Sequence, residues 1–514
     1  MITAVISRGA GPLAEGRLEE LLRSPLIRKV IVLDAGGGSP LPPRCEALAV
    51  SDPASGPTWN ALLAKVATRY LLHVSPGDVR PDPRAPGRLF DTAEATGAGM
   101  VYADYAEIRG GNILEHPVND YQTGSIRDGF DFGPVMLIST VAARRALRKY
   151  GAIPPCRWAG WYDLRLKLST DRALFHLPER LSVVAEVAGA GADGTGQGDK
   201  TVGDRFGTGQ GDRFEICPPQ FAYVDPGNRA FQEEMEAAAT AHLRRIGAWL
   251  APVFRDVLPS NNPFPVEASV VIPVRNRART VADAVKSAFA QRTDFPFNVI
   301  VVDNHSTDDT KAILADLAGR HPALKHVVPK RMDLSIGGCW NEAIFSKACG
   351  RYAVQLDSDD LYQGDDVLQR LIDLLRRGNC ALVVGAYTLV DGNLREIPPG
   401  LIDHREWTDV NGRNNALRIN GLGAPRAFNT AILRRNGFPN VGYGEDYAAA
   451  LRLSREYRIG RIYDSLYLCR RWEGNTDAAL SIEQANRHDA YKDRLRTIEI
   501  RARRKLNGVR GWRS

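Results

Sequence analysis

Apolar residues recur along the C-terminal half of the chain in two alternating patterns. Short runs rich in β-branched residues predict strands at 269–272, 299–302, 352–356 and 381–384. Helical spacing of apolar residues predicts helices at 281–290, 310–318, 341–348 and 367–375. This alternation is typical of an α/β fold, a mainly parallel sheet with helices on both faces. In such sheets ligands bind beyond the carboxyl ends of the strands.

The two halves of the chain resemble each other in the order of their motifs. Four features recur, each displaced by roughly 270 to 285 residues: a strand ending in aspartate (Asp34 and Asp303), a Trp-Asn pair (Trp59 and Trp340), an Arg-Tyr pair before a strand (Arg69 and Arg351) and a Leu-x-Leu-Ser segment (166–169 and 451–454). Four ordered matches predict a duplicated α/β domain.

The duplication and the composition between the copies predict four segments. The first domain takes 1–187, a linker with a bridging helix takes 188–266, the second domain takes 267–486, and a basic tail takes 487–514. Residues 188–211 are dense in Gly and Asp, which is typical of a flexible linker. Residues 230–250 have helical apolar spacing and precede four prolines, at 252, 259, 263 and 265.

The net charge of +7 is concentrated in the tail. From Arg487 to Ser514, ten Lys or Arg against three acids also give +7, so the rest of the chain is formally neutral and no nucleic-acid partner is expected. The tail has apolar residues at helical spacing, which are Tyr491, Leu495, Ile498, Ala502 and Leu506. We expect this helix to dock on its own domain; attachment to an anionic membrane surface is the alternative.

Neither a membrane span nor a secretory signal is predicted, because the chain has no run of about 18 apolar residues and no basic N-terminus before an apolar stretch. The seven cysteines are scattered, without a CxxC pair, which argues against disulfides and a zinc site. We therefore expect a cytoplasmic protein, peripheral on the inner face of the membrane if the tail binds there.

Carboxylates follow two of the predicted strands. Asp303 ends one strand, and Asp357 and Asp359 follow another. Two carboxylates separated by one residue offer hard oxygen ligands to Mg²⁺ or Mn²⁺, ions that commonly bridge to a diphosphate. Such an ion would neutralise the charge on a departing nucleotide diphosphate. On spacing alone, an ordinary acidic turn is the better explanation.

The context of these acids favours a functional site. Five motifs occur in order: Val-Ile-Pro-Val-Arg-Asn at 271–276, Val-Val-Asp-Asn-His-Ser-Thr-Asp at 301–308, Gly-Arg-Tyr at 350–352, Leu-Asp-Ser-Asp-Asp at 356–360 and Gly-Glu-Asp at 444–446. Together they resemble family-2 glycosyltransferases with an A-type nucleotide-binding fold, over roughly residues 268–480. The N-terminal half resembles the same family faintly, so the expected architecture is two tandem A-type domains, the first degenerate.

The resemblance implies a role for each matching residue. Pro273 and Asn276 would lie beside the nucleotide, Asp303 would bind its base, Asp357 and Asp359 would hold the donor and the metal, Asp446 with Glu445 would provide the catalytic base, and Arg470, Arg471 and Trp472 would lie near the donor phosphates. It further implies an inverting, metal-dependent transfer from a nucleotide-diphosphate sugar to a hydroxyl of a glycan or lipid-linked acceptor, in cell-surface glycan synthesis.

Some of these residues have simpler explanations. Glu445 and Asp446 also suit the N-cap and first turn of a helix at 447–456, where the positive helix end favours carboxylates. Arg470 and Arg471 also suit a solvated charged surface. Many family members have arginine where Trp340 stands, and because Trp59 repeats the substitution, we expect both tryptophans in the core.

The first copy lacks the acids of the second. Ser75 and Gly77 stand in place of Asp357 and Asp359, and Trp161 aligns with Asp446. We therefore expect a catalytically silent copy that serves packing, acceptor binding or partner contacts.

Two other functions stay open on the sequence alone. A sugar-phosphate nucleotidylyltransferase would have a similar sheet, but it needs a glycine-rich basic loop, and residues 274–280 contain no glycine. A non-catalytic carbohydrate-binding or scaffold protein would not need the acids that the second copy keeps.

Overall fold

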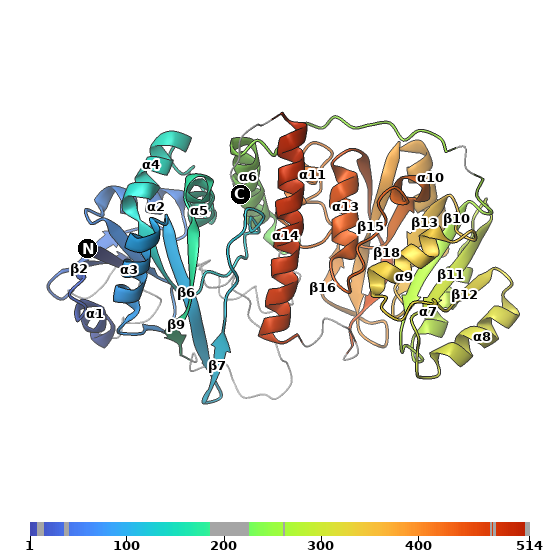
Figure 1. The fold of residues 1–514 in the computed structure, drawn as a ribbon, viewed down its shortest axis with the longest axis horizontal. Helices are drawn as coiled ribbons and strands as arrows, with labels where there is room; N and C mark the ends of the chain where they lie inside the picture. The colour runs from blue at the N-terminus through green and yellow to red at the C-terminus, as the bar shows by residue number, and fades with distance from the viewer. Residues whose placement is uncertain are drawn as a thin grey trace. The chain divides into compact units, whose positions relative to one another are not determined.

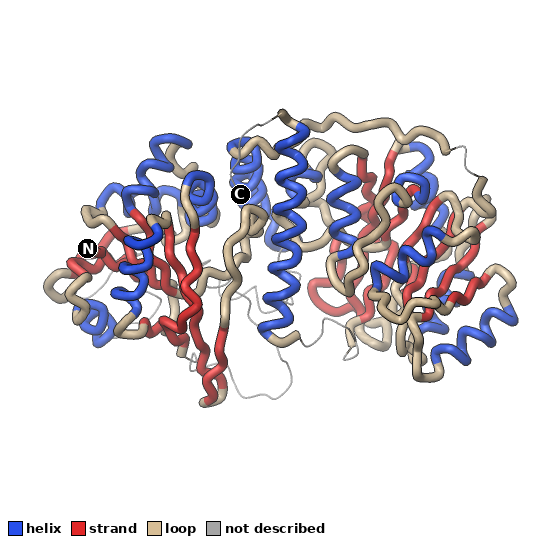
Figure 2. Tube along the Cα trace, viewed as in Figure 1, coloured by secondary structure: helices blue, strands red, loops and turns tan. Residues whose placement is uncertain are grey.

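The computed structural model describes residues 1–7, 15–34, 41–185, 226–260, 263–472, 475 and 480–508. The chain forms two compact units (Figures 1 and 2). The first comprises Met1–Glu215, Ala230–Trp249 and Leu480–Ser514, and the second comprises Ile216–Arg229 and Leu250–Ala479. The predicted Gly/Asp-rich linker at 188–211 and the last six residues of the tail lie outside the described residues.

The first unit has a sheet flanked by helices. Its elements are β1 (Ile2–Ser7), α1 (Glu15–Leu22), β2 (Ile27–Asp34), β3 (Cys45–Ala49), α2 (Gly56–Lys65), β4 (Tyr70–Val74), β5 (Val79–Pro81), α3 (Ala85–Thr96), β6 (Met100–Arg109), β7 (Asn112–His116), β8 (Val135–Ser139), α4 (Thr140–Tyr150), α5 (Gly160–Asp171), β9 (Leu174–Val184), most of α6 (Arg229–Arg245) and α14 (Ile482–Leu506). The strand order is β3-β2-β1-β4-β8-β6-β9-β5, with β7 paired to β6.

The second unit repeats this plan. Its elements are β10 (Ala268–Val274), α7 (Val281–Phe289), β11 (Phe297–Asp303), α8 (Thr310–Arg320), β12 (Leu324–Val327), α9 (Ile336–Phe345), β13 (Tyr352–Gln355), β14 (Leu361–Tyr362), α10 (Val367–Arg377), β15 (Cys380–Val390), β16 (Glu396–Ile402), α11 (Gly412–Asn415), β17 (Arg426–Asn429), α12 (Thr430–Leu433), α13 (Glu445–Ser454) and β18 (Arg458–Arg470). The strand order is β12-β11-β10-β13-β17-β15-β18-β14, with β16 paired to β15.

The two strand orders correspond position by position, which confirms the predicted tandem of α/β domains. The register corresponds as well: Tyr70 of β4 pairs with Ser139 of β8, and Tyr352 of β13 pairs with Asn429 of β17. Equivalent positions in the two units can therefore be assigned from the sheets themselves.

Both sheets are mixed rather than mainly parallel. In the second unit β12, β11, β10 and β13 are parallel neighbours, whereas β17 lies antiparallel between β13 and β15. The four strands that the sequence predicts, which are β10, β11, β13 and β15, are all parallel to one another. The sequence pattern missed β17 because this short strand follows the long connection after β16, which has no regular alternation of strand and helix.

The helix predicted at 341–348 begins earlier, at Ile336. Two glycines conceal its start in the sequence because they weaken the helical pattern. Gly337 is required there by close packing, since a Cβ at this position would lie 1.9 Å from the carbonyl oxygen of Pro439. The first turn of α9 therefore packs backbone to backbone against the loop that leads to α13.

The C-terminal helix α14 belongs to the first unit, and its buried face differs from the apolar stripe seen in the sequence. Ile498 and Leu506 of that stripe are more than half exposed. Asp493, Arg496 and Arg503 are instead fully buried. Charged side chains can face inward here because the surface beneath them provides partners of opposite charge and hydrogen-bonding groups.

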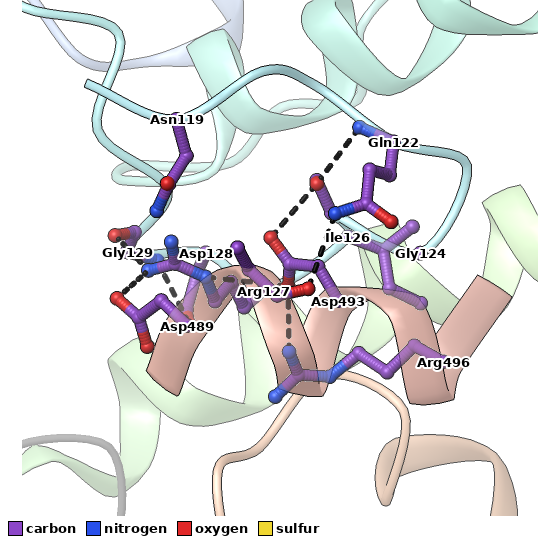
Figure 3. Close-up of polar contacts among 12 residues, drawn as sticks. Asn119, Gln122, Gly124, Ile126, Arg127, Asp128, Gly129, Asp489, Asp493 and Arg496 are labelled. Carbon is purple, nitrogen blue, oxygen red and sulfur yellow. Dashed lines mark hydrogen bonds and ion pairs between the residues drawn. The ribbon is translucent and has the colours of Figure 1, made fainter. Parts of the chain in front are cut away.

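The loop before β8 supplies partners for Asp493 (Figure 3), whereas Arg496 and Arg503 pair with acids of α14 itself. Gly124 allows the backbones to touch, because a Cβ there would lie 2.1 Å from the carbonyl oxygen of Asp493. The Ser125 hydroxyl donates to Asp493 over 2.8 Å, and the guanidinium of Arg127 lies 3.4 Å from the same carboxylate. On the helix itself, Arg496 donates to Asp493 over 2.7 Å. Asp493 thus joins the helix to the loop.

None of the helices in the described part of the chain combines the length and apolar character that a membrane crossing requires.

Replacing Asp493 by Ala is expected to destabilise the first unit by about 3 kcal/mol or more, because Arg496 and Arg127 would lose a buried carboxylate. Urea unfolding of the full chain measures the change. Arg494→Ala, an exposed position on the same helix, is the matched control and should change stability by less than about 0.5 kcal/mol. Equal effects of the two substitutions would contradict the role given to Asp493.

Candidate active site

The parallel strands β10, β11 and β13 bring the predicted nucleotide-site residues to one edge of the second sheet. Val274 and Asp303 are paired at the carboxyl ends of β10 and β11. Asp303 is buried, and its carboxylate accepts from the backbone N–H of Ser306 over 2.9 Å. The loops that follow these strands are joined as well, because the Asn276 side-chain oxygen accepts from the Thr307 N–H over 2.8 Å. Pro273 lies in β10, one residue before its end.

A crowded group of carboxylates follows β13. The Asp357 backbone N–H donates to the Tyr467 hydroxyl over 2.9 Å, and Asp360 accepts from the Arg470 backbone N–H over 2.8 Å. Burial, and secondly the charge of Asp357, raise the pKa of Asp359. Burial together with both neighbouring carboxylates raises the pKa of Asp360 well above its usual range. Desolvation is the larger cause of both shifts, and the neighbouring carboxylates add to it.

Asp357 and Asp359 suit a divalent cation only if a bound ligand completes the coordination shell of the ion. Among the residues that the structure describes, no group of three or more His, Cys, Asp or Glu is arranged to hold a metal ion alone. Mg²⁺ is commonly bound by one or two carboxylates together with substrate phosphates and water. Asp357 and Asp359 fit that arrangement, because they supply two hard oxygen donors from one loop, close enough for the charge of Asp357 to raise the pKa of Asp359.

Arginines surround the acidic loop. Arg470 is buried rather than solvated: its guanidinium donates to the carbonyl oxygen of Asp359 and lies 3.4 Å from Asp283. Arg277 lies 3.7 Å from the Asp359 carboxylate. A simple charged surface therefore does not describe Arg470, which holds the acidic loop in place.

Two residues that follow β18, Trp472 and Asn475, contact the arginines and the acid of this group. The Trp472 ring lies 5.1 Å from the guanidinium of Arg279 and 6.0 Å from that of Arg277. The Asn475 amide donates to Asp359 over 3.3 Å. The Arg471 backbone N–H donates to the Val390 carbonyl oxygen over 2.7 Å, which fixes the segment to β15.

Glu445 and Asp446 occupy the first turn of α13, after Gly444 at the N-cap. Glu445 is buried, whereas the Asp446 side chain is 30% exposed. The Asp446 carboxylate pairs with the guanidinium of Arg426 and accepts from the Tyr447 N–H over 2.6 Å. The first-turn position predicted from the sequence is thus present, together with an ion pair that the sequence did not indicate.

Side-chain contacts connect Asp446 to the acidic loop. Arg426 donates from Nε to the side-chain oxygen of Gln355 over 2.8 Å. The Gln355 amide nitrogen donates to Asp357 over 2.8 Å. The two acids that lie 89 positions apart in the sequence, Asp357 and Asp446, are therefore linked through two side chains.

The first unit has a different set at the equivalent positions. His73 and Trp161 pack against Trp59 with ring centroids 5.3 and 5.2 Å from it. All three side chains are buried, and burial lowers the pKa of His73 to about 4, so it is neutral. Ser75 replaces Asp357. The first copy therefore contains Trp161, packed against Trp59, where the second contains the charged Asp446.

Both Trp-Asn tryptophans lie in the core, as predicted. Trp340 is buried and packs against Phe428 and Phe438, with centroid distances of 6.0 and 5.2 Å. Trp59 is buried to the same degree.

Sequence analysis did not identify Gln355, Arg426, Arg277 or Asn475 as site residues. Weak signals exist for two of them: Gln355 is polar at the end of an apolar strand, and Arg277 lies in an Arg-Asn-Arg-Ala-Arg loop. Arg426 has no local signal, because its significance depends on β17 lying beside β13.

Residues 269–442 match the model of the family described as "Glycosyl transferase family 2". Among curated proteins, the chain is 36% identical to a chondroitin synthase of Escherichia coli over 100 residues, which are 19% of this chain and 14% of that protein. It is 25% identical to the O-antigen chain rhamnosyltransferase WbaN of Salmonella anatum over 178 residues, 34% of this chain and 54% of that protein. An uncharacterised Mycobacterium tuberculosis protein is 28% identical over 109 residues, 21% of this chain and 31% of that protein, so the matches span only part of these relatives.

Two solved structures are similar over part of the chain. Staphylococcus aureus TarS 1–349 in complex with UDP is 23% identical, with 45% of this chain and 65% of that chain covered and a TM-score of 0.35. The Pyrobaculum calidifontis mannosyltransferase PcManGT, in complex with GDP-Man and Mn²⁺, is 19% identical, with coverage of 56% and 87% and a TM-score of 0.33. Because both TM-scores are low, the fold is assigned from the strand order of the two sheets.

Proposed function

We propose that this chain, whose residues 269–442 match glycosyl transferase family 2, moves a sugar from a nucleotide-diphosphate sugar to a hydroxyl acceptor. The reaction is inverting and depends on Mg²⁺ or Mn²⁺, and the acceptor is a glycan or a lipid-linked glycan of the cell surface. The observation that carries the proposal is the linkage of Asp357 to Asp446 at the edge of the second sheet where parallel strands end.

Each part of the site has a task in this reaction. Asp303, Pro273 and Asn276 line the side that receives the nucleotide. Asp357 and Asp359 would hold the divalent ion, which would neutralise charge on the leaving diphosphate. Arg277, Arg279 and Arg471 supply further positive charge on that side, whereas the buried Arg470 keeps the acidic loop in place.

Asp446, with Glu445 beside it, is the candidate base. It accepts the proton of the acceptor hydroxyl while the hydroxyl oxygen forms a bond to the anomeric carbon and the bond to the diphosphate oxygen breaks. Attack from the face opposite the leaving group inverts the configuration. The names of the matched relatives, a chondroitin synthase and an O-antigen chain rhamnosyltransferase, support a polysaccharide as the acceptor class.

A panel of nucleotide sugars, each incubated with the full chain and Mn²⁺ while released nucleotide is measured, tests the proposal. We expect one donor to release a nucleoside diphosphate in a metal-dependent way. Pyrophosphate release from a nucleoside triphosphate plus a sugar phosphate would instead assign a nucleotidylyltransferase. No product from either reaction would leave a binding or scaffold function.

Two substitutions separate donor binding from catalysis. Asp359→Ala should abolish turnover and Mn²⁺-dependent donor binding, because one of two metal-binding carboxylates is lost. Asp446→Asn should keep donor binding and lower kcat by about 10² to 10⁴, the usual contribution of a general base. Calorimetric donor titration and initial rates measure both effects.

Asp365→Ala is the control, because this acid of the same unit is exposed and pairs with the exposed Arg292. It should behave like the unsubstituted protein. Normal activity of either active-site variant would refute the role assigned to that residue.

The helix α14 offers a surface for peripheral attachment to an anionic membrane. Arg487, Arg494, Arg501 and Lys505 are exposed and are spaced by seven, seven and four residues, which places them on one side of the helix, with the exposed Ile498 among them. A basic residue near an anionic surface contributes about 1 kcal/mol of attraction.

The double variant Arg494→Glu/Arg501→Glu should therefore sediment at least tenfold more weakly with phosphatidylserine-containing vesicles at low salt. Pure phosphatidylcholine vesicles are the control and should bind neither protein. These surface substitutions are preferable to removing the helix, because removal would also take away the buried Asp493. Unchanged sedimentation would exclude α14 as the attachment surface.

A further inference from the structure

We propose that Arg426 and Gln355 are positioning residues that set the orientation of Asp446 from the donor-holding carboxylate Asp357. The inference rests on the proposed function, and it adds two residues that the motifs do not include. Side-chain contacts join the base to the donor site. The base is therefore correctly oriented only while Asp357, Gln355 and Arg426 keep these contacts.

A series of side-chain contacts leads from the acidic loop to the base, and Gln355 is its first member. Gln355 donates from its amide nitrogen to Asp357 and accepts with its amide oxygen from Arg426 Nε, each over 2.8 Å. A rotated amide would place its NH₂ against the guanidinium and its oxygen against the carboxylate, and both contacts would become repulsive. The position of Asp357 therefore determines the orientation of the amide.

Arg426 transfers that orientation to the base. Its guanidinium has Nε on Gln355 and Nη1 on Asp446, and its planar geometry fixes the angle between the two contacts. The Arg426 side chain is 13% exposed, and Gln355 is buried. Because water has little access to these groups, the hydrogen bonds to the charged ends are stronger than they would be on the surface.

The sheet explains why these side chains meet. Val354 of β13 pairs with Ala427 of β17, so Gln355 and Arg426 are the next pair along the two antiparallel strands. β17 is the strand that interrupts the parallel order between β13 and β15. Its insertion places a cation beside the end of β13, where the acidic loop begins.

A purely structural ion pair is the competing explanation, and the duplicated sheet argues against it. In the first unit Leu72 pairs with Leu137, and His73 pairs with Met136, so His73 and Met136 are the equivalents of Gln355 and Arg426. The acids are replaced as well, by Ser75 and Trp161. The same strand order thus forms without any member of the connection, so the fold itself does not require it.

The substitution Arg426→Met, which installs the residue of the first copy, tests the proposal. We expect donor binding with Mn²⁺ to stay within about threefold of the unsubstituted protein, while kcat falls at least about 10²-fold, because the base loses its orientation. Gln355→Met should lower kcat in the same way. Arg426→Lys keeps the charge and should recover part of the rate, but not all of it, because lysine cannot contact both partners with one planar group.

A double variant distinguishes positioning from a general loss of structure. If Arg426 acts through Asp446, then Asp446→Asn/Arg426→Met should be no slower than Asp446→Asn alone. Arg370→Met removes an arginine that pairs with the exposed Asp464, and it should leave kcat unchanged. Urea unfolding checks that each variant is folded.

Three outcomes would overturn the inference: Arg426→Met with normal kcat, an Arg426→Met effect confined to donor affinity, or a double variant whose losses multiply. Failure of the proposed function gives a different result, because the unsubstituted protein would then release no nucleotide from any donor. If the unsubstituted protein releases nucleotide and Arg426→Met has a normal kcat, the transferase function is retained. Only the positioning role of Arg426 is then refuted.

Discussion

A carboxylate that leaves water needs a compensating partner, and this constraint shapes both units of the chain. Removing an ion from water costs several kcal/mol even after the protein relaxes. In the second unit Asp446 is balanced by Arg426, while Asp360 has a backbone N–H of Arg470. Burial, and secondly the neighbouring carboxylates, raise the pKa of Asp359 and of Asp360 in the acidic loop.

The first unit meets the same constraint in two ways. Ser75, Gly77 and Trp161 stand at the positions equivalent to Asp357, Asp359 and Asp446, so these three positions carry no charge that needs a partner. Under α14 the charges are kept and compensated, with Asp493 between Arg127 and Arg496. The common strand order shows that neither solution is dictated by the fold. One copy keeps acids at this edge of its sheet, and the other has uncharged residues at the equivalent positions.

The division between the copies bears on how the proposed reaction is organised. Motif residues at the ends of β10, β11 and β13 arise from local sequence and form the proposed donor side. The proposed base comes from α13, and the side chains that join it to that side come from β13 and β17. A site assembled in this way depends on strand neighbours as much as on motifs.

The sequence by itself determined the two α/β copies, the acids at the strand ends, the loss of those acids in the first copy and the burial of Trp59 and Trp340. These features are encoded by spacing and residue type within short segments, which local periodicity reveals. Tertiary structure alone decided that β17 lies between β13 and β15, that Arg426 meets Gln355 and Asp446, and that α14 buries its charged face. Each of these depends on which distant segment lies alongside, and local spacing carries no information about that neighbour. A charged side chain is buried only where another part of the fold supplies its partner.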